Sequence, residues 1–350
     1  MKDSIFKSTL RSFFVTIAVF LGLSGGIFIL ALLILLSSSE ENTTKLKIDT
    51  KYKPLILPNA LGIRKEESKT SPVILQLNIS GIIGADSLNT NTFTQQLIES
   101  REGDLKDDRV KAILLYINSP GGTVYDADAI YRALKAYKEQ YKVPIYAFVD
   151  GMCASGGVYV ACAADKIFAT DSSLVGSVGV LISPFLNFSK IMEKIGINSL
   201  TLTAGKNKDA LNPLRPWKEG EQDNLQSAVN EYYNNFVTIV TTNRPKMDRK
   251  KLIDEYGADV FLAPQAEKYG YVDQIGVSQR DVLLAMLHEL QITDQNYQVV
   301  TLEKKNWLID LFSEQGPTNS LGQMKHSIDW GDGLPNEVRG KLLYLYRNDK

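Results

Sequence analysis

The sequence has few of the side chains on which disulfide frameworks and metal sites depend. Its 350 residues include two cysteines and two histidines, and two cysteines cannot by themselves form a disulfide framework or a zinc site. Cys153 and Cys162 lie in an apolar run, which predicts buried free thiols. The formal charge of −1 lacks the basic excess that is typical of nucleic-acid-binding proteins. We therefore expect no metal and no nucleic-acid partner.

Charge is absent from one long stretch near the N-terminus. Residues 12–36, "SFFVTIAVFLGLSGGIFILALLILL", carry no charged side chain, and a helix rising about 1.5 Å per residue over this length exceeds the ~30 Å hydrocarbon core of a bilayer. Three basic residues precede the stretch, and Glu40 and Glu41 follow it. The positive-inside rule then places residues 1–11 in the cytoplasm and the rest of the chain outside. A cleaved signal peptide is the alternative, but its apolar region would span only about 7–15 residues. We expect an uncleaved transmembrane anchor.

The remaining chain is long and apolar enough, at 44% hydrophobic residues, to bury a sizeable core. Residues 37–70 are polar and predict a linker. From 71 to 290, apolar strands alternate with amphipathic helices, and the nearly uninterrupted apolar run within 110–122 indicates a strand buried on both faces. This order predicts an α/β fold with a parallel sheet and right-handed crossover helices. The pattern weakens beyond 290, so residues 291–350 predict a C-terminal extension.

Two further elements are expected near the end of this body. "SLTLTA", residues 199–204, alternates like a strand. A long amphipathic helix is predicted at 219–242, and its apolar face makes self-association plausible.

Ser155 stands where a buried strand, 143–149, gives way to a helix. The free N–H groups of a first helical turn point at such a position and favour negative charge. A second glycine-rich loop, "NSPGG" at 118–122, follows the neighbouring strand, and loops at the carboxyl ends of parallel strands meet in one crevice. The amides of Gly122 and Gly156 can therefore form an oxyanion hole. Either loop alone would usually be a simple turn, but together they indicate a nucleophilic serine.

A nucleophilic serine needs a base, and neither histidine lies near it in sequence. His288 falls in an amphipathic helix and His326 in the C-terminal extension, so both are predicted to be packing or surface residues. A lysine kept neutral by desolvation can replace histidine as the base. The turn "TAGKNKDALNP", residues 203–213, offers Lys206 and Lys208. The spacing alone does not choose between them.

Four motifs in order carry a family resemblance: "YINSPGG", "DGMCASGGVYVACAADKIFA", "LVGSVGVL" and "TAGKNKD". Together they resemble the short, single-repeat form of signal peptide peptidase A, a membrane-anchored Ser/Lys serine peptidase of the Clp protease/crotonase superfamily. The resemblance covers residues 71–280. It implies a Clp protease/crotonase-like parallel sheet with crossover helices, preceded here by one N-terminal transmembrane helix, and it implies no cofactor.

The resemblance also assigns roles within these motifs. The family's nucleophile falls on Ser155, and its general base falls on Lys208, the lysine that precedes aspartate. The serine that hydrogen-bonds this lysine falls on Ser177, and the oxyanion amides fall on Gly122 and Gly156.

The implied function is a serine endopeptidase that degrades cleaved signal peptides and other unfolded or membrane-proximal peptides after a small or apolar residue. The implied location is the bacterial inner or plasma membrane, with a single pass and an extracytoplasmic catalytic domain. Such peptidases form homo-oligomeric rings whose sites draw serine and lysine from neighbouring protomers. The apolar substrate groove is expected between the residues after "PGG" and the segment 179–186.

Two other functions fit parts of the sequence. A crotonase-type acyl-CoA enzyme would share the fold and the oxyanion hole without a Ser/Lys pair, but an extracytoplasmic body makes CoA a poor candidate substrate. A catalytically idle membrane scaffold or partner-binding protein is the other alternative, and the intact set of Ser155, Ser177 and Lys208 argues against it.

Overall fold

The computed structural model describes residues 51–85, 88–293, 295–305 and 342–345, together with positions 18, 22, 25 and 26. Those four isolated positions are helical, and the rest of the predicted anchor lies outside the described residues. No helix among the described residues is long and apolar enough to cross a bilayer. The chain divides into two units, 1–49 and 50–350, and the features below belong to the second.

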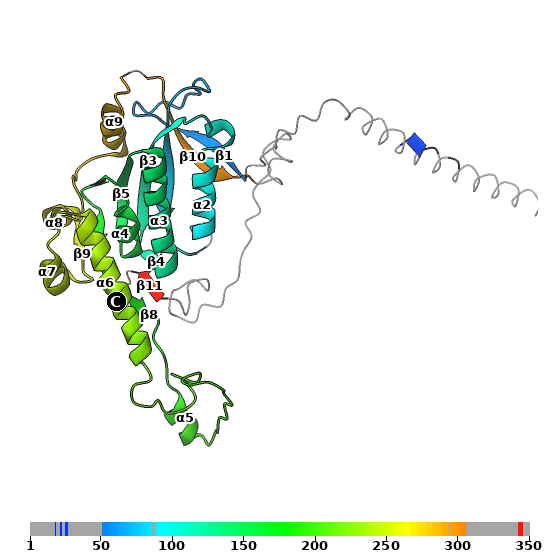
Figure 1. The fold of residues 1–350 in the computed structure, drawn as a ribbon, viewed down its shortest axis with the longest axis vertical. Coiled ribbons are helices and arrows are strands. Elements are labelled where there is room, and N and C mark those ends of the chain that lie inside the picture. Colours follow the sequence, from blue (N-terminus) through cyan, green and yellow to red (C-terminus); the bar gives the residue numbers. More distant parts are fainter. Residues whose placement is uncertain are drawn as a thin grey trace, which may run out of the picture. The chain divides into compact units, whose positions relative to one another are not determined.

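A mostly parallel sheet forms the centre of this unit (Figure 1), which confirms the predicted α/β class. Its described strands follow the order β1-β10-β2-β3-β5-β7-β9, with β6 also paired to β5. Only the edge strands β1 and β9 run antiparallel to their neighbours. The strands are β1 Tyr52–Leu57, β2 Val73–Ser80, β3 Val110–Ser119, β5 Ile145–Ala154, β6 Lys166–Ala169, β7 Leu174–Gly176, β9 Val260–Leu262 and β10 Gln298–Lys304.

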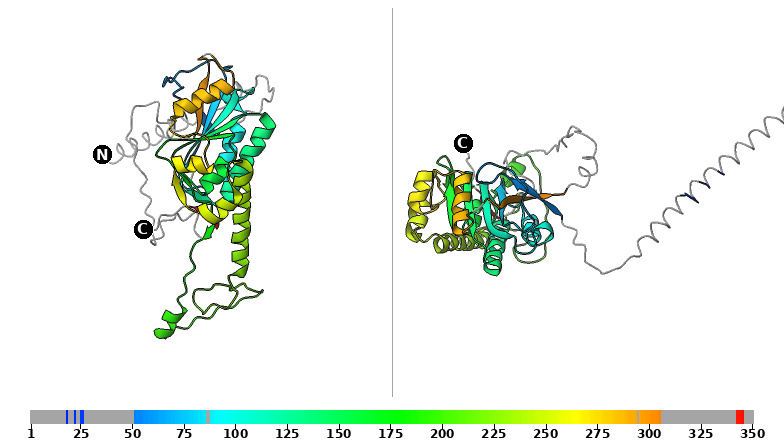
Figure 2. Two further views of the ribbon diagram at one scale, coloured as in Figure 1. Left: turned by 90° about the vertical axis from the view of Figure 1, so that its left-hand side faces the viewer. Right: turned by 90° about the horizontal axis from the view of Figure 1, so that it is seen from above.

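Helices cover both faces of the sheet (Figures 1 and 2). The side chains of α2, α3, α4, α8 and the second half of α6 join one apolar cluster, whereas α9 joins a second cluster on the opposite face. The helices are α2 Thr90–Glu99, α3 Val124–Tyr141, α4 Gly156–Ala161, α5 Ser189–Lys194, α6 Asp223–Asn243, α7 Arg249–Lys251, α8 Ala263–Tyr269 and α9 Gln279–Glu289, with single turns η1 at Gly103–Leu105 and η2 at Leu252–Tyr256.

Strand β3 shows why the sheet is buried on both faces. Successive side chains of a strand point to opposite faces. Ile113 and Leu115 accordingly join the cluster with α3 and α4, while Ala112 and Leu114 join the cluster with α9. The prediction of a two-sided buried strand in 110–122 is confirmed, and this strand ends directly before the glycine loop of the site.

The sheet also takes in residues from the segments expected to flank the body. Strand β1 lies within the expected linker, and β10 lies within the expected C-terminal extension, yet the two pair antiparallel at one end of the sheet. The buried carboxylate of Glu99 on α2 accepts hydrogen bonds from the backbone amides of Lys51 and Tyr52, each at 2.8 Å. These hydrogen bonds hold the start of β1 against α2.

One part of the unit is scarcely buried: residues 184–210, which we call the arm. None of these residues is buried, and the chain between α5 and α6 lies beyond the first turns of α6, apart from the sheet (Figures 1 and 2). The predicted strand at 199–204 is wrong, because these residues form no strand. Leu200 and Leu202, which gave the alternating pattern, are 84% and 85% exposed and have no partner strand in the described chain.

A small second sheet joins distant parts of the sequence. Strand β11 (Leu342–Leu345) lies between β4 (Gly121–Thr123) and β8 (Leu181–Ile182), antiparallel to both. The C-terminal strand is thus inserted beside the glycine loop that follows β3.

Candidate active site

Ser155 lies at the junction of β5 and α4 with an uncommon backbone conformation. Its φ and ψ are 52° and −114°, values that a residue with a side chain rarely adopts and that cost about 1–3 kcal/mol. The junction is held because the Ser155 amide donates to the Gly176 carbonyl at 2.8 Å, and the Tyr159 amide donates to the Ser155 carbonyl at 3.1 Å. The surrounding sheet fixes the serine in a strained position, which is common at functional sites.

The hydroxyl of Ser155 has no hydrogen-bond partner within the described part of the chain, although it is fully buried. The residue as a whole is 1% exposed. Buried polar groups are nearly always paired, so a lone buried hydroxyl calls for an explanation. The hydroxyl of a nucleophilic serine whose base is not in place would lack a partner in this way.

The two glycine loops meet beside this serine, as the sequence predicted. A Cβ added to Gly156 would lie 3.1 Å from the Gly122 amide nitrogen, and a Cβ added to Gly121 would lie 2.7 Å from the Gly156 amide nitrogen. Ile83 pairs with Gly121 and Thr123 through their backbones, at 2.8 and 2.9 Å, so the intervening Gly122 amide points away from Ile83. Glycine is required here because a side chain would fill the space between the two amides.

Ser177 lies next to Ser155 at the ends of neighbouring strands. Ala154 pairs with Gly176 in the register of β5 and β7, and Ser177 follows directly. Its amide donates to the Asp259 carbonyl at 2.7 Å, and the residue is 5% exposed. The structure therefore brings Ser155, Ser177, Gly122 and Gly156 to one place.

Lys208 is not brought to that place by its own chain. It lies on the arm and is exposed, as is Lys206 two residues earlier. No hydrogen bond or ion pair of either side chain is found among the described residues.

The turn that carries Lys208 is nevertheless organised by an ion network. Arg215 lies 2.5 Å from the Asp209 carboxylate and 2.7 Å from that of Glu221, and Glu221 also accepts the Leu211 amide at 3.0 Å. The hydrogen bond from Arg215 lowers the pKa of Asp209 below its ordinary value, and the Leu211 amide lowers the pKa of Glu221. The sequence did not predict this network, because the spacing of Asp209, Arg215 and Glu221 over 13 residues matches no regular pattern of helix or strand.

Comparisons with known proteins identify the family of the chain. The model of peptidase family S49 matches residues 137–292, and the Clp protease model matches residues 70–198. A protein of Enterococcus faecium named as signal peptide peptidase SppA is 34% identical over 247 residues, which is 69% of each chain. The chain belongs to peptidase family S49.

Two further relatives are similar over more than half of the chain. A protease of Methanocaldococcus jannaschii is 33% identical over 226 residues, covering 64% of this chain and 71% of its own length. A protease of Synechocystis sp. is 29% identical over 286 residues, covering 80% of this chain and 98% of its own length. The S49 chain is accordingly a serine peptidase, which confirms the family resemblance read from its motifs.

The S49 peptidase has two cysteines and two histidines that could be considered as alternative nucleophiles or bases. Cys153 and Cys162 are buried free thiols, as predicted. Burial raises the pKa of Cys153 far above its ordinary value and that of Cys162 to about 12, so both remain protonated and unreactive. His288 is exposed on α9, whose buried side chains pack on the opposite face of the sheet from α4. His326 lies outside the described residues.

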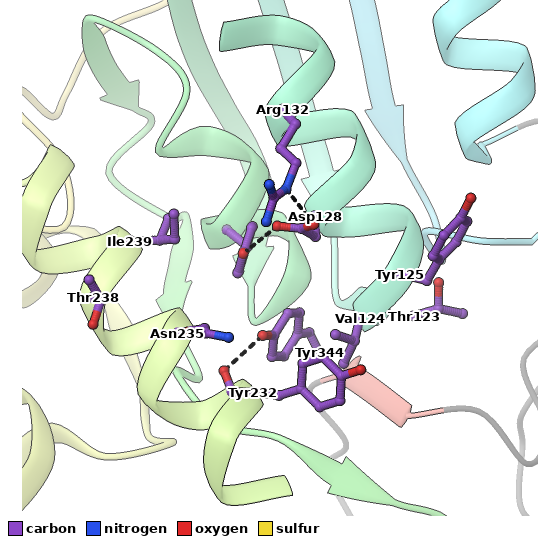
Figure 3. A pocket seen from close by; sticks show the side chains of 11 residues that line it. Thr123, Val124, Tyr125, Asp128, Arg132, Tyr232, Asn235, Thr238, Ile239 and Tyr344 are labelled. Carbon is purple, nitrogen blue, oxygen red and sulfur yellow. Dashed lines mark hydrogen bonds and ion pairs between the residues drawn. The ribbon is translucent and has the colours of Figure 1, made fainter. Parts of the chain in front are cut away.

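The two segments that were expected to line the substrate groove of this peptidase both pair with a C-terminal strand of the same chain. Strand β4 takes in the two glycines of "PGG" and the residue after them, β8 falls within 179–186, and β11 lies between these two strands. Tyr344 pairs with Gly122, and its ring lies at a pocket of about 540 Å³ between α3, α4 and α6 (Figure 3). Sequence reasoning missed this strand. Its signal was the apolar run "LLYL" in a charged tail.

Proposed function

We propose that this S49 peptidase is a membrane-anchored Ser/Lys endopeptidase in which Ser155 of one copy works with Lys208 of a neighbouring copy. One observation carries the proposal. The nucleophile, the two oxyanion amides and Ser177 are assembled and buried within one chain, whereas Lys208 is exposed on the arm. A site that has every group but its base is expected when a second copy supplies the base.

The chemistry of an amine base explains why burial against another copy matters. A lysine in water has a pKa of about 10.4 and is almost wholly protonated at pH 7. Only a desolvated amine is neutral often enough to accept a proton from serine. Docking of the arm onto a neighbouring copy would remove Lys208 from water and place it beside the buried hydroxyl of Ser155.

The arm has the composition of a surface that is covered in an assembly. Monomeric proteins rarely expose large contiguous apolar patches, and such patches mark interaction sites. A second copy is the proposed cover, because the same contact would complete the site, and head-to-tail contacts of this kind close into rings. The exposed apolar side chains of the arm and the loop after it are Phe185, Leu186, Phe188, Ile191, Ile195, Ile197, Leu200, Leu202, Leu214 and Trp217.

The proposed reaction follows from these positions. The Ser155 hydroxyl attacks a peptide carbonyl while its proton passes to the neutral amine of Lys208, and Ser177 orients that amine. The amides of Gly122 and Gly156 stabilise the negative charge that develops on the carbonyl oxygen. The protonated lysine then donates to the leaving amine, and a water activated by the same lysine releases the acyl group from Ser155.

Residues 12–36 are proposed to tether the catalytic body to the outer face of the inner or plasma membrane. Tethering raises the effective concentration of an enzyme near substrates in the same bilayer. The proposed substrates are therefore cleaved signal peptides and other unfolded or membrane-proximal peptides. Carbonate extraction and protease accessibility of intact cells test this placement: release by carbonate, or protection of the body from external protease, would contradict it.

Mixing of two inactive variants tests the shared site. Ser155→Ala and Lys208→Ala chains, each tagged differently, are co-expressed and purified through both tags from detergent. We expect each variant alone to be inactive on a fluorogenic peptide, and the mixture to recover about a quarter of wild-type activity, since random mixing leaves one site in four with both groups. Absence of any recovery, with intact assembly, would show that serine and lysine must come from one chain.

A further inference from the structure

The loop that carries the Gly122 amide has few restraints of its own. Gly121 has a φ of 102°, a value that favours glycine, and neither glycine has a side chain to fix the backbone. At the start of the loop, the Ser119 hydroxyl accepts the Gly121 amide at 3.1 Å. An oxyanion donor is effective only when its direction is fixed before the reaction, so the end of the loop at Thr123 must be held as well.

The backbone partner of this loop is itself part of a connection. Ile83 pairs with Gly121 and Thr123, at 2.8 and 2.9 Å, but it lies between the end of β2 and the start of α2. Pairing of two connections fixes them to each other and leaves open what fixes them to the rest of the fold. A contact that joins both connections to a helix would do so.

The carboxylate of Asp126, in the first turn of α3, makes this contact. One of its oxygens accepts the Thr123 hydroxyl at 2.5 Å. The other accepts both the amide and the hydroxyl of Thr90, the first residue of α2, at 2.9 and 2.8 Å. Asp126 is 7% exposed and Thr123 is 1% exposed. The carboxylate therefore links the end of the glycine loop to the start of α2, and both of them to α3.

The connection before α2 leaves room for this carboxylate. A Cβ added to Gly84 would lie 2.6 Å from the Oδ2 atom of Asp126 and 2.7 Å from the Thr123 hydroxyl oxygen. Capping of α3 would require only the hydrogen bond from the Asp126 amide to the Thr123 hydroxyl, at 3.1 Å. The hydrogen bonds to Thr90 are additional, and they indicate a role beyond capping.

We propose that Asp126 is a positioning residue for the oxyanion hole, and that it fixes the direction of the Gly122 amide through Thr123. The inference deepens the proposed function and rests on its assignment of Gly122 as an oxyanion donor. Asp126 does not contact the substrate in this role. It keeps one donor preorganised for the transition state, so its loss lowers kcat more than it changes KM.

The test replaces Asp126 by asparagine, which keeps the size of the side chain but removes its charge and one acceptor. We expect kcat on a fluorogenic peptide to fall by about 10- to 100-fold, with KM within about threefold of the wild-type value. A displacement of about 1 Å at a reacting group can cost about 10²-fold, and loss of a whole oxyanion donor costs about 10²–10³-fold. Asp126→Ala should reduce kcat at least as much.

Glu99→Gln is the matched control. Glu99 is also a buried carboxylate, 3% exposed, that accepts backbone amides, but those amides belong to Lys51 and Tyr52 at the start of β1. Glu99→Gln and Asp126→Asn should lower the midpoint of thermal unfolding by similar amounts, whereas Glu99→Gln should change kcat by less than about threefold. Equal losses of kcat in the two variants would show that Asp126 acts on stability alone.

Thr123→Val removes the same hydrogen bond from its other end. It should lower kcat about as much as Asp126→Asn does, and the double variant should lose less than about twofold more, because both substitutions break one link. Thr123→Ser keeps the hydroxyl and should restore most of the activity lost in Thr123→Val. Losses that multiply in the double variant, or a Thr123→Ser protein as slow as Thr123→Val, would overturn the link through Thr123.

The outcomes separate this inference from the proposed function. A wild-type protein that hydrolyses no peptide, although it is folded and assembled, would contradict the proposed function itself. An active wild type in which Gly156→Ala is strongly impaired, while Asp126→Asn and Thr123→Val are not, would overturn the positioning role and leave the function standing. If Asp126→Ala does not fold, the asparagine and valine variants decide the question.

Discussion

The two sides of the candidate site are built in opposite ways. Ser155, Ser177 and the two glycine amides lie at the ends of buried parallel strands, where the backbone of each is held by a neighbour in the sheet. Lys208 lies on an arm in which no residue from 184 to 210 is buried. The first side is preorganised by the fold of one chain, whereas under the proposed function the second would gain its surroundings on contact with another copy.

This difference indicates how the peptidase would be kept inactive as a single chain. Preorganised donors are worth most in a water-excluded site, and they need no rearrangement during the reaction. Under the proposed function, a base on an exposed arm would need such a rearrangement, because it would act only after assembly had removed it from water. Four predictions test the comparison, starting with the side that depends on assembly.

The largest effect is expected for the lysine. Lys208→Met should lower kcat/KM by about 10³-fold or more, since loss of a general base removes proton transfer from the serine. Lys206→Met is the matched control on the same turn and should change the rate by less than about threefold. Steady-state kinetics of both variants, with assembly checked by mass photometry, make the comparison. Equal effects of the two substitutions would contradict the assignment of Lys208, and not Lys206, as the base.

The oxyanion amides come next. Gly156→Ala should lower kcat by about 10²–10³-fold, the usual cost of losing one oxyanion donor, because its Cβ would sit 3.1 Å from the Gly122 amide. Gly157→Ala places a Cβ 3.2 Å from the Ser119 carbonyl, away from those amides, and should retain most activity. Thermal unfolding should shift by similar amounts in the two variants. A fully active Gly156→Ala protein would contradict the assignment.

A moderate effect is expected for the apolar surface of the arm. Leu200→Ser combined with Leu202→Ser should weaken self-association by about 100-fold or more, because each of the two leucines buried in a contact contributes about 1.5–3 kcal/mol. The folding of the single chain should not change, since both side chains are exposed in it. Leu61→Ser, at an exposed leucine outside the arm, is the control. Sedimentation of the solubilised proteins would reveal equal association if the arm were not the contact.

The smallest effect concerns the ion network behind Lys208. The pKa values of Asp209 and Glu221 are lowered in the folded chain, so their contribution to stability is present above the unfolded values of about 4 and is lost as pH falls through the folded values. The protection factors of residues 205–222, which are their hydrogen-exchange rates corrected for the intrinsic effect of pH, should therefore fall a few-fold from pH 6 to pH 3. Arg215→Ala should have low protection factors at both pH values. Equal protection of this segment in all four conditions would show that the network does not order it.

The sequence predicted that the two glycine loops meet beside Ser155, because the determinants of this arrangement are local. A buried strand, a small residue and two glycines at each of two strand ends specify Ser155 and the neighbouring loops, and the rule for parallel sheets brings those ends together. The roles of Ser177 and Lys208 came from the family resemblance. Their presence in one working site remains a prediction.

The parts that the sequence did not predict depend on partners far away in the chain or outside it. Leu200 and Leu202 alternate with polar residues as the residues of a strand do, but the same alternation fits an exposed segment whose leucines contact another molecule. Strand β11 pairs with residues more than 150 positions earlier. Its four residues are too few to predict such a pairing from the sequence. The Arg215 network likewise depends on a turn whose path no local rule gives.

The hydrogen bonds of Glu99 to the amides of Lys51 and Tyr52 have a mechanical consequence. They clamp the first two residues of the body to α2, at the end of a strand that is already paired along its length with β10. A pull on the chain at Lys51 would therefore load these hydrogen bonds and the β1–β10 pairing first. Three strands, β10, β2 and β3, separate β1 from β5, the strand that ends directly before Ser155.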